Sequence, residues 1–486
     1  MRLYSNMQTE KKYTGKPLCL DLDGTLIATD SLAESLLVMI KMNPLYFFLV
    51  PFWCLRGKYY LKEKIEHHSK ISPEKLPYRE EFLEFVKQEK AKGRMIVLAT
   101  ASMQSIGDKV AEHLGIFDLV LGSNSGENLR SANKRDELIR RFGEKGFDYA
   151  GDSKADLKVW RAADKAILVE PSKRILHSAE AGGNVAKVFK TDFPRLKTYL
   201  KEIRVYQWIK NILLFVPFLL AHKIPDSAMI ESLICGFFAF SIVASFVYVM
   251  NDLLDLEADR MHPKKRFRGL ASGRISLFSG LLMLPILLLV SFGISIAFLP
   301  WQFIACLAVY FVLNIAYSLY FKKQIIVDII ALSVMYSLRL VVGGLLADVP
   351  ISPWLIEFSV FFFFSLAAVK RFSELFNLRE AGHQSVKRRG YTVGDLGLIR
   401  NFGIISGYMS VLIIALYVNS AEVTRLYHTP ELLWGISPLL LYWVSRVWFL
   451  AHRGKMNEDP IVFTGKDPAS YVVGILVVLI AIGATL

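Results

Sequence analysis

The chain has 486 residues, enough for two or three domains, and 53% of them are hydrophobic. Its formal charge of +14 is compatible with nucleic-acid binding, but the basic residues lie in short loops between long apolar runs. That arrangement favours a membrane protein, so we expect no nucleic-acid partner. Four cysteines without CxxC or zinc spacing imply no disulfide framework. The first 16 residues lack the apolar core of a signal peptide, which predicts a first domain that stays in the cytoplasm.

Residues 1–200 mix charged and apolar residues as a soluble domain does. The stretch 18–25 (LCLDLDGT) predicts a short buried strand that runs into two carboxylates, a glycine and a threonine. Further strand-like runs end at Thr100 and Asp152, with helical stretches between them. This alternation predicts an α/β Rossmann-like fold with a parallel sheet, whose strand ends form the site.

The residue types at these strand ends suit phosphate chemistry. Asp21 can attack phosphorus, and Asp23, two residues later, can protonate the leaving oxygen. The attack needs a divalent cation, so we expect Mg²⁺ at Asp21, Asp23 and Asp152. Lys134 supplies a fixed positive charge, and Thr100 can hydrogen-bond the phosphoryl group.

These four motifs, in this order, resemble those of the haloacid dehalogenase phosphatases. The resemblance implies that Asp21 forms an aspartyl-phosphate, that Asp23 is the general acid/base, and that Asp156 supports the phosphate and magnesium site. Lys145 and Lys154 are alternatives to Lys134.

The long insert between the first two motifs, at about residues 31–90, fits a helical cap. Within it, the apolar run 35–55 is interrupted by Lys41, Asn43 and Pro44. We expect this run to pack on the domain or to lie in the membrane surface, rather than to form an extra span.

From about Trp208 onward, long apolar runs alternate with short charged loops, which predicts a second, all-α domain over residues 201–486. Because about 20 apolar residues cross a bilayer, we predict nine spans, at residues 205–222, 232–250, 276–299, 301–321, 325–346, 351–369, 401–418, 432–450 and 470–486.

The distribution of basic residues predicts the orientation of these spans. The four loops expected inside carry 18 lysines and arginines, whereas the outer connections carry only Lys223 and Arg425. This asymmetry predicts a multi-pass protein of the inner (cytoplasmic) membrane, with the first domain and the polar loops in the cytoplasm.

The second predicted span ends in residues 251–273, NDLLDLEADRMHPKKRFRGLASG. On a helix, Asp252, Asp255 and Asp259 share one face and repel each other unless cations lie between them. Oxygen-only ligands favour Mg²⁺, which usually also binds substrate phosphates. The basic residues that follow suit phosphate oxygens: Arg260, Lys264, Lys265, Arg266 and Arg268. The alternative is a solvated acidic and basic loop.

A second polar set lies in an otherwise apolar span. Asp328 and Arg339 are eleven residues apart, on one helical face, and ionisable groups at membrane depth normally line a functional cavity. The alternative is that Asp328 is a structural partner of Arg339. Gly343 and Gly344 are expected to permit close helix packing.

These motifs resemble the UbiA superfamily over residues 201–486, and within it most closely the decaprenyl-phosphate phosphoribosyltransferase branch. The resemblance implies further substrate-binding residues: Lys210, Asn211, Asn251, Tyr317, Lys322, Asp328, Arg339, Lys370 and Arg371. The sequence departs from that branch at Gly269, where proline is common, and in the loop EDPIVFTGKD.

The implied reaction is Mg²⁺-dependent transfer of phosphoribose from 5-phosphoribosyl pyrophosphate to a membrane-bound polyprenyl phosphate, with Asp252 and Asp255 as catalytic residues. The first domain would then remove the 5-phosphate. One alternative is an aromatic prenyltransferase that uses polyprenyl diphosphate, beside an independent small-molecule phosphatase. Another is a non-enzymatic membrane scaffold. The sequence leaves the polyprenyl length and the oligomeric state open, a homo-oligomer included.

Overall fold

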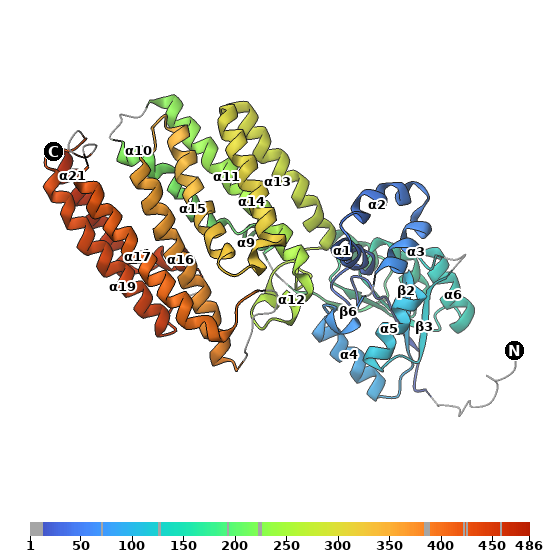
Figure 1. Cartoon of the computed structure of the whole chain (residues 1–486). Helices are drawn as coiled ribbons and strands as arrows, with labels where there is room; N and C mark the ends of the chain where they lie inside the picture. The colour runs from blue at the N-terminus through green and yellow to red at the C-terminus, as the bar shows by residue number, and fades with distance from the viewer. Residues whose placement is uncertain are drawn as a thin grey trace. The chain divides into compact units, whose positions relative to one another are not determined.

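A computed structural model of the chain describes residues 13–69, 71–124, 128–191, 194–221, 226–382, 389–420, 423, 426–456 and 459–486. Lys223 and Arg425, which enter the orientation argument, lie outside these residues. The chain forms two compact units (Figure 1). Unit 1 comprises Met1–Glu202 and Val249–Leu284, and unit 2 comprises Ile203–Tyr248 and Pro285–Leu486. The first division of the chain, after Glu202, is close to the domain boundary expected at residue 200. Residues 249–284 differ from the expectation, because they group with the first domain and not with the second.

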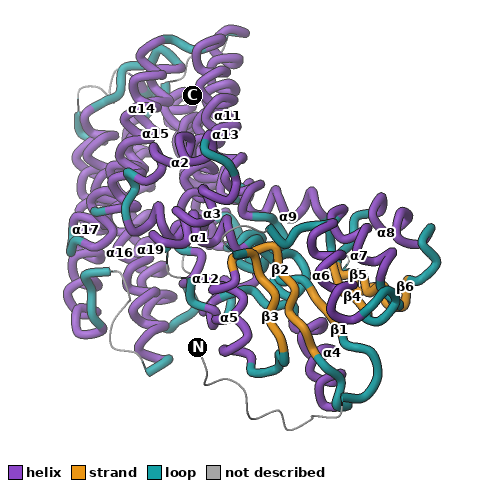
Figure 2. Tube along the Cα trace, turned by 90° about the vertical axis from the view of Figure 1, so that its right-hand side faces the viewer, coloured by secondary structure: helices purple, strands orange, loops and turns teal. Residues whose placement is uncertain are grey.

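Unit 1 contains a six-stranded sheet with the strand order β3-β2-β1-β4-β5-β6 (Figure 2). All neighbouring strands are parallel, which confirms the predicted α/β fold. The strands are β1 (Leu18–Leu20), β2 (Ile96–Met103), β3 (Leu119–Ser123), β4 (Asp148–Gly151), β5 (Ala166–Val169) and β6 (Val185–Phe189).

Both faces of this sheet are buried, as parallel sheets require. Leu18 and Leu20 pack into one apolar cluster and Cys19 into the other, because successive side chains alternate between the faces. The first cluster includes α4 (Glu80–Ala91) and α5 (Gln104–Leu114), and the second includes α6 (Ala132–Phe142), α7 (Leu157–Ala162) and α8 (Lys173–Glu180).

The insert after β1 is a helical cap formed by α1 (Ser31–Met42), α2 (Tyr46–Leu55), α3 (Lys58–His68) and η1 (Pro73–Lys75). The predicted cap extended to about residue 90, but α4 packs on the sheet, since Phe82 and Val86 are buried in its apolar cluster. The cap is therefore shorter than expected. The 10-residue α2 is too short to cross a bilayer, which argues against an extra span at residues 35–55.

Residues 249–284 contribute the end of α11 (Ser227–Leu254), then α12 (Leu256–Met261), η4 (Lys265–Phe267) and the start of α13 (Leu277–Phe298) to unit 1. Arg260 pairs with Glu34 of α1, and both side chains are buried. At Gly273 the backbone has a φ of +73°, and an added Cβ would lie 2.1 Å from the carbonyl oxygen of Ala28. Only glycine allows this close approach.

Unit 2 is helical. It contains most of α11 and α13. Its other elements are η3 (Val205–Phe215), α10 (Val216–Leu220), α14 (Trp301–Leu319), η5 (Phe321–Lys323), α15 (Val327–Leu346), α16 (Pro353–Glu380), η6 (Val393–Asp395), α17 (Leu396–Val418), η7 (Pro430–Gly435), α19 (Ile436–His452), α20 (Pro460–Thr464) and α21 (Pro468–Thr485). A further helix, α9 (Arg195–Glu202), ends unit 1 ahead of η3.

Seven helices among the described residues are long and apolar enough to span a membrane, or eight if α9 with η3 and α10 counts as one bent span. The predicted count of nine is therefore not reproduced by length and composition. The first predicted span is a bent, largely 3₁₀ segment, as Lys210 and Pro217 within it would suggest. The predicted span at 351–369 lies in α16, which carries charged residues over its last three turns. This helix is not one of the seven candidate membrane spans.

Small residues permit close packing in unit 2, as predicted. A Cβ on Gly343 of α15 would lie 2.1 Å from the carbonyl oxygen of Leu214 in η3. A Cβ on Gly344 would lie 2.2 Å from the side chain of Ile351. Both glycines therefore allow close contacts, with the backbone of Leu214 and the side chain of Ile351, that larger residues would prevent.

Candidate active sites

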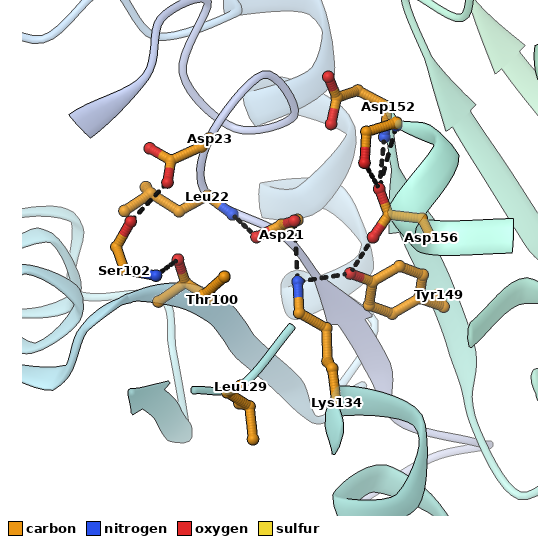
Figure 3. A network of polar contacts seen from close by, with 12 residues as sticks. Asp21, Leu22, Asp23, Thr100, Ser102, Leu129, Lys134, Tyr149, Asp152 and Asp156 are labelled. Carbon is orange, nitrogen blue, oxygen red and sulfur yellow. Dashed lines mark hydrogen bonds and ion pairs between the residues drawn. The ribbon is translucent and has the colours of Figure 1, made fainter. Parts of the chain in front are cut away.

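The carboxyl end of β1 places Asp21 at the centre of a buried polar network in unit 1 (Figure 3). The Nζ of Lys134, on α6, lies 2.8 Å from Asp21 Oδ2 and donates to the Tyr149 hydroxyl at 3.0 Å. The Lys134 side chain is only 2% exposed. Burial raises the pKa of Asp21, and Lys134 opposes that shift. The lysine therefore offsets part of the cost of burying the Asp21 carboxylate in its charged form.

Asp21 lies beside two carboxylates that follow β4. One oxygen from each of Asp21, Asp152 and Asp156 lies within 4.8 Å of the others. Burial, reinforced by Asp156 and Asp21, raises the pKa of Asp152 to about 8. Three carboxylates this close suit a divalent cation, which offsets their repulsion.

Asp156 has a different role from its two neighbours. Its Oδ1 accepts from the Tyr149 hydroxyl at 2.9 Å, and its Oδ2 accepts from the backbone and hydroxyl of Ser153 at 3.0 and 2.8 Å. These protein donors fix Asp156, so Asp21 and Asp152 are the better ligands for an added ion. Asp156 holds the turn that carries Asp152.

Asp23 points away from these carboxylates, toward the cap and β2 (Figure 3). Its carboxylate accepts from the Ser31 backbone at 2.7 Å and from the Ser102 hydroxyl at 2.5 Å. Burial, with the nearby charge of Asp30, raises the pKa of Asp23 to about 7. Asp23 can thus carry a proton near neutral pH, as a general acid must. Among the described residues, the Asp23 side chain is not part of the metal-binding group, although the sequence motif suggested it as a ligand.

The remaining predicted groups lie around the same strand ends. Thr100 is fully buried within β2, which continues to Met103 beyond the strand end expected at Thr100, and its Oγ1 accepts from the backbone of Ser102 at 3.0 Å. Of the alternatives to Lys134, Lys145 donates to the carbonyls of Arg161 and Ala163, and Lys154 is exposed. Lys134 is therefore the lysine at Asp21.

Several contributors were missed in the sequence. Tyr149 connects Lys134 to Asp156, and Ser102 and Ser31 donate to Asp23. The position of Ser102, two residues after Thr100 on the same strand end, was the available signal. Nothing in the local sequence marks Tyr149 or Ser31.

The acidic segment of unit 1 lies where α11 meets α12. The helix is irregular at Asp255, but its hydrogen bonds continue through the break, from Asp255 to Asn251 and from Asp259 to Asp255. Asp252 and Asp259 share a face as predicted, and both accept from the same Nη1 of Arg268, at 2.8 and 2.5 Å. Burial raises the pKa of Asp259, and Arg268 opposes the shift.

Among the described residues, the carboxylates of Asp252, Asp255 and Asp259 do not lie close enough together to form a ready metal-binding group. Arg268 supplies the positive charge between Asp252 and Asp259 in this structure. The donor set itself fits Mg²⁺: Asp252 and Asp259 are buried, and the side-chain oxygen of Asn251 is buried without a partner among the described residues. An added cation would take the place of Arg268 between them.

The basic residues after α12 divide into two groups. Arg260 is engaged by Glu34, at 3.1 and 2.5 Å, and by the carbonyls of Lys75 and Ala271. By contrast, Lys264 and Arg266 are exposed and Lys265 is half-buried. The second group is better placed to receive a phosphate than Arg260 is.

The second predicted polar set lies in unit 2, and the alternative in which Asp328 pairs with Arg339 is wrong. Asp328 is fully buried, and its carboxylate lies 2.7 Å from Arg371 Nε and accepts from the Tyr391 hydroxyl at 2.6 Å. Arg371, on α16, also donates to Tyr317 at 3.0 Å. Arg339 is therefore not the partner of Asp328. Helical spacing placed both on one face of α15 but could not show which neighbouring helix supplies each partner.

Arg339 instead joins η3 to the bundle of unit 2. It donates to Asn211 Oδ1 at 2.8 Å and to the Tyr310 hydroxyl at 2.9 Å. Lys210, the neighbour of Asn211, is buried and forms an ion pair with the partly buried Asp459, in the loop that departed from the family pattern. Lys322 lies in η5 and Lys370 is half-buried on α16. Lys210, Asn211 and Arg339 thus form one polar region, whereas Tyr317, Asp328 and Arg371 form another.

A cleft of about 800 Å³ lies within unit 1, beside the carboxyl ends of β5 and β6. Its wall includes Arg79, whose Nε donates to the carbonyl of Gly24, in the turn after Asp23. The other basic residues that line it are Lys75, Lys190, Arg195, Arg260, Arg266 and Arg274, and its acidic residues are Glu74, Glu80, Glu81 and Glu170. The cleft thus connects residues 260–276 with the strand ends of the sheet.

Residues 212–466 match the UbiA prenyltransferase family. Residues 52–161 match the haloacid dehalogenase-like hydrolases, and this matched range begins after the motif at residues 18–25. The uncharacterized protein y4nM of Sinorhizobium fredii is 39% identical over 465 residues, which cover 95% of this chain and 89% of that protein. The nodulation protein NoeC of Azorhizobium caulinodans is 32% identical, over 57% of this chain and 89% of NoeC. A decaprenyl-phosphate phosphoribosyltransferase of Mycolicibacterium smegmatis is 35% identical over 182 residues, 36% of this chain and 56% of that enzyme. This chain is an integral membrane protein that belongs to the UbiA prenyltransferase family and carries a haloacid dehalogenase-like hydrolase domain before its UbiA domain.

Proposed function

We propose that this protein catalyses two consecutive reactions on a membrane lipid. The UbiA domain transfers phosphoribose from 5-phosphoribosyl pyrophosphate to a polyprenyl phosphate. The hydrolase domain then removes the 5-phosphate, which leaves polyprenyl-phosphoryl-ribose. The similarity to decaprenyl-phosphate phosphoribosyltransferase supports the first step, and the network around Asp21 supports the second.

The observation that carries the proposal is the composition of unit 1. The acidic segment of the UbiA domain and the hydrolase domain belong to one compact unit, although the 46 residues Ile203–Tyr248 of unit 2 separate them in sequence. The buried pair of Arg260 and Glu34 and the close approach of Gly273 to Ala28 join them. A covalently linked second site acts at high effective concentration on the product of the first.

The cleft of unit 1 supports the same proposal. It is lined by basic side chains from both the hydrolase domain and residues 260–276, and it reaches Arg79, beside the turn that follows Asp23. A lipid-linked sugar phosphate carries two phosphate groups, and cationic side chains bind such groups well. The cleft therefore suits the headgroup of the intermediate.

In the hydrolase step, an Asp21 oxygen attacks the phosphorus and the bond to the ribose oxygen breaks. Asp23 donates its proton to that oxygen, and the ribose hydroxyl leaves. Water then attacks the aspartyl-phosphate while Asp23 accepts a proton, which releases phosphate and restores Asp21. Mg²⁺ held by Asp21 and Asp152 would offset the charge of the phosphoryl group. Lys134 and Thr100 hold the phosphoryl oxygens in this scheme.

In the transfer step, an oxygen of the polyprenyl phosphate attacks C1 of the ribose and pyrophosphate leaves. The acceptor oxygen is already anionic, so no strong general base is needed. Asp252, Asp255 and Asp259 would hold Mg²⁺, which stabilises the leaving pyrophosphate. Lys264, Lys265 and Arg266 are then positioned to bind phosphate oxygens, and Arg268 is released from its two aspartates.

The test uses the full protein in proteoliposomes with labelled 5-phosphoribosyl pyrophosphate and a polyprenyl phosphate. The parent should form mainly the dephosphorylated lipid, whereas Asp21→Asn should accumulate polyprenyl-phosphoryl-ribose 5-phosphate. Asp252→Asn should prevent lipid labelling yet retain hydrolysis of p-nitrophenyl phosphate. If the parent leaves the 5-phosphate on the lipid, and Asp21→Asn changes nothing, the two reactions are not consecutive. Transfer from polyprenyl diphosphate to an aromatic ring, without incorporation of ribose, would instead support the aromatic prenyltransferase alternative.

A further inference from the structure

The cap helix α2 presents an apolar face that no described part of the protein covers. Its sequence, YFFLVPFWCL, contains no charged residue. Large apolar side chains on and just before it are exposed at spacings of three and four residues: Met42 at 64%, Leu45 at 69%, Phe48 at 67%, Leu49 at 42%, Phe52 at 66% and Leu55 at 86%. We call these six residues the α2 stripe. Leu45, Phe48, Leu49, Phe52 and Leu55 follow one face of α2, and Met42 ends α1 just before it.

The opposite face of α2 packs inside the cap. The Tyr46 ring lies 4.7 Å from the ring of His68 on α3, and its hydroxyl is 3.2 Å from His68 Nδ1. Trp53 stacks on the same histidine, with 6.0 Å between ring centroids. The orientation of α2 on the cap is therefore fixed, and the α2 stripe faces outward because of the fold.

A helix on the surface of a soluble domain normally presents polar residues outward. Here both faces are apolar, and a contiguous apolar patch of this kind marks a contact surface. Charges flank the stripe: Lys41 precedes it and Arg56 follows it. Exposed Phe and Leu side chains bury apolar area when they enter the headgroup boundary of a bilayer, and the flanking basic residues are attracted to anionic lipids.

We propose that the α2 stripe inserts into the surface of the lipid bilayer in which the UbiA domain resides. The bilayer is favoured over a protein partner because unit 1, which carries the cap, also contains the ends of α11 and α13, two helices long and apolar enough to span a membrane. Ten residues are too few to cross the bilayer, so α2 lies in its interface.

The position of the cap gives this contact a role in the hydrolase site. Ser31, at the start of α1, donates its backbone N–H to Asp23, and Lys62 of α3 donates to the carbonyl of Ala101 at the end of β2. The cap that carries the α2 stripe is thus bonded to the catalytic strand ends on both sides. Insertion of α2 holds the opening of the hydrolase site at the level of lipid headgroups.

The first test measures insertion alone and does not depend on the proposed function. Cys54 is the exposed native cysteine of α2, and Cys19 is buried. In a Cys235→Ala/Cys306→Ala background, Cys54 is labelled with an environment-sensitive fluorophore. The full protein is then reconstituted in phosphatidylglycerol and phosphatidylcholine that is brominated in its acyl chains. We expect about a twofold loss of emission relative to unbrominated lipid. A matched label at Lys87→Cys, on the exposed face of α4 and with Cys54→Ala added to the same background, should lose almost none.

Equal emission from Cys54 in the two lipids overturns the proposal. Disulfide cross-linking of Cys54 to a second copy, without quenching, also overturns it and identifies a protein partner instead. Quenching at both Cys54 and Lys87→Cys overturns it as well, because the contact would then not be specific to α2.

The second test uses Phe48→Glu/Phe52→Glu and rests on the proposed function. Both rings are exposed, so the fold should tolerate the change. The KM for a phosphomonoester on a lipid should rise roughly tenfold or more, since burial of each ring contributes to binding. The kinetics with soluble p-nitrophenyl phosphate should not change. An unchanged KM for the lipid, with quenching intact at Cys54, would refute the lipid-borne substrate but not the insertion of α2.

Discussion

The buried ion pair between Lys134 and Asp21 yields a quantitative prediction. Lys134→Met retains the length of the side chain but leaves the Asp21 carboxylate without its cation, beside Asp152 and Asp156. Removal of one partner of a buried pair costs roughly 3 to 5 kcal/mol. At 1.36 kcal/mol per factor of ten, this corresponds to a roughly 10²- to 10⁴-fold change in the equilibrium for opening of the hydrolase domain.

Hydrogen exchange of the full protein, in detergent with EDTA and followed by mass spectrometry, measures this opening in peptides that cover β1 and β4. Protection should fall by the stated factor in Lys134→Met, but much less when the same change is made in an Asp21→Asn background. Lys154→Met, an exposed lysine of the same domain, is the matched control and should behave like the parent. If Lys134→Met lowers the hydrogen-exchange protection by the same factor in the parent and in the Asp21→Asn background, electrostatic pairing is not the reason for the loss.

Two further predictions concern other parts of the chain. Gly343→Val places side-chain atoms against the Leu214 carbonyl and should destabilise unit 2 by about 1 to 3 kcal/mol or more. The measurement is the rate at which heating abolishes lipid labelling, which should increase. Gly293→Val, at a site with no neighbour within 4 Å, is the control and should leave this rate unchanged. Ser102→Ala removes a hydrogen bond that lowers the pKa of Asp23, so this pKa should rise above about 7. The alkaline limb of p-nitrophenyl phosphate hydrolysis should then move to higher pH, and a shift to lower pH would contradict the role of Asp23 as the acid.

The strand-end motifs of the hydrolase domain could be read from sequence because the fold uses them locally. An apolar strand that ends in LDLDGT fixes the position of Asp21, and parallel pairing brings Asp152 to the same edge of the sheet. The position of Lys134 could also be predicted from the sequence, because it lies in the first turn of the predicted helix that forms α6. Tyr149 could not be predicted, because its role depends on which side chains meet across the sheet.

The helical domain was harder to predict from periodicity. Spacing placed Asp328 and Arg339 on one face of α15, but the partner of Asp328 comes from α16, and only packing selects it. Similarly, α4 has helical periodicity like the cap helices, yet it packs on the sheet. Sequence spacing gives the face of an element, whereas the neighbour of that face is a tertiary property.

The discontinuity of unit 1 has a consequence for synthesis of the chain. The last strand of the sheet ends at Phe189, but the unit is complete only at Leu284. At 5 to 20 residues per second, translation of the intervening chain takes roughly 5 to 20 seconds. During this interval the hydrolase domain can fold while Glu34 and Ala28 still lack their partners in residues 249–284. A ribosome that stalls before residue 260 would therefore display a folded sheet whose docking surface is empty, the state in which a chaperone or protease would meet this protein.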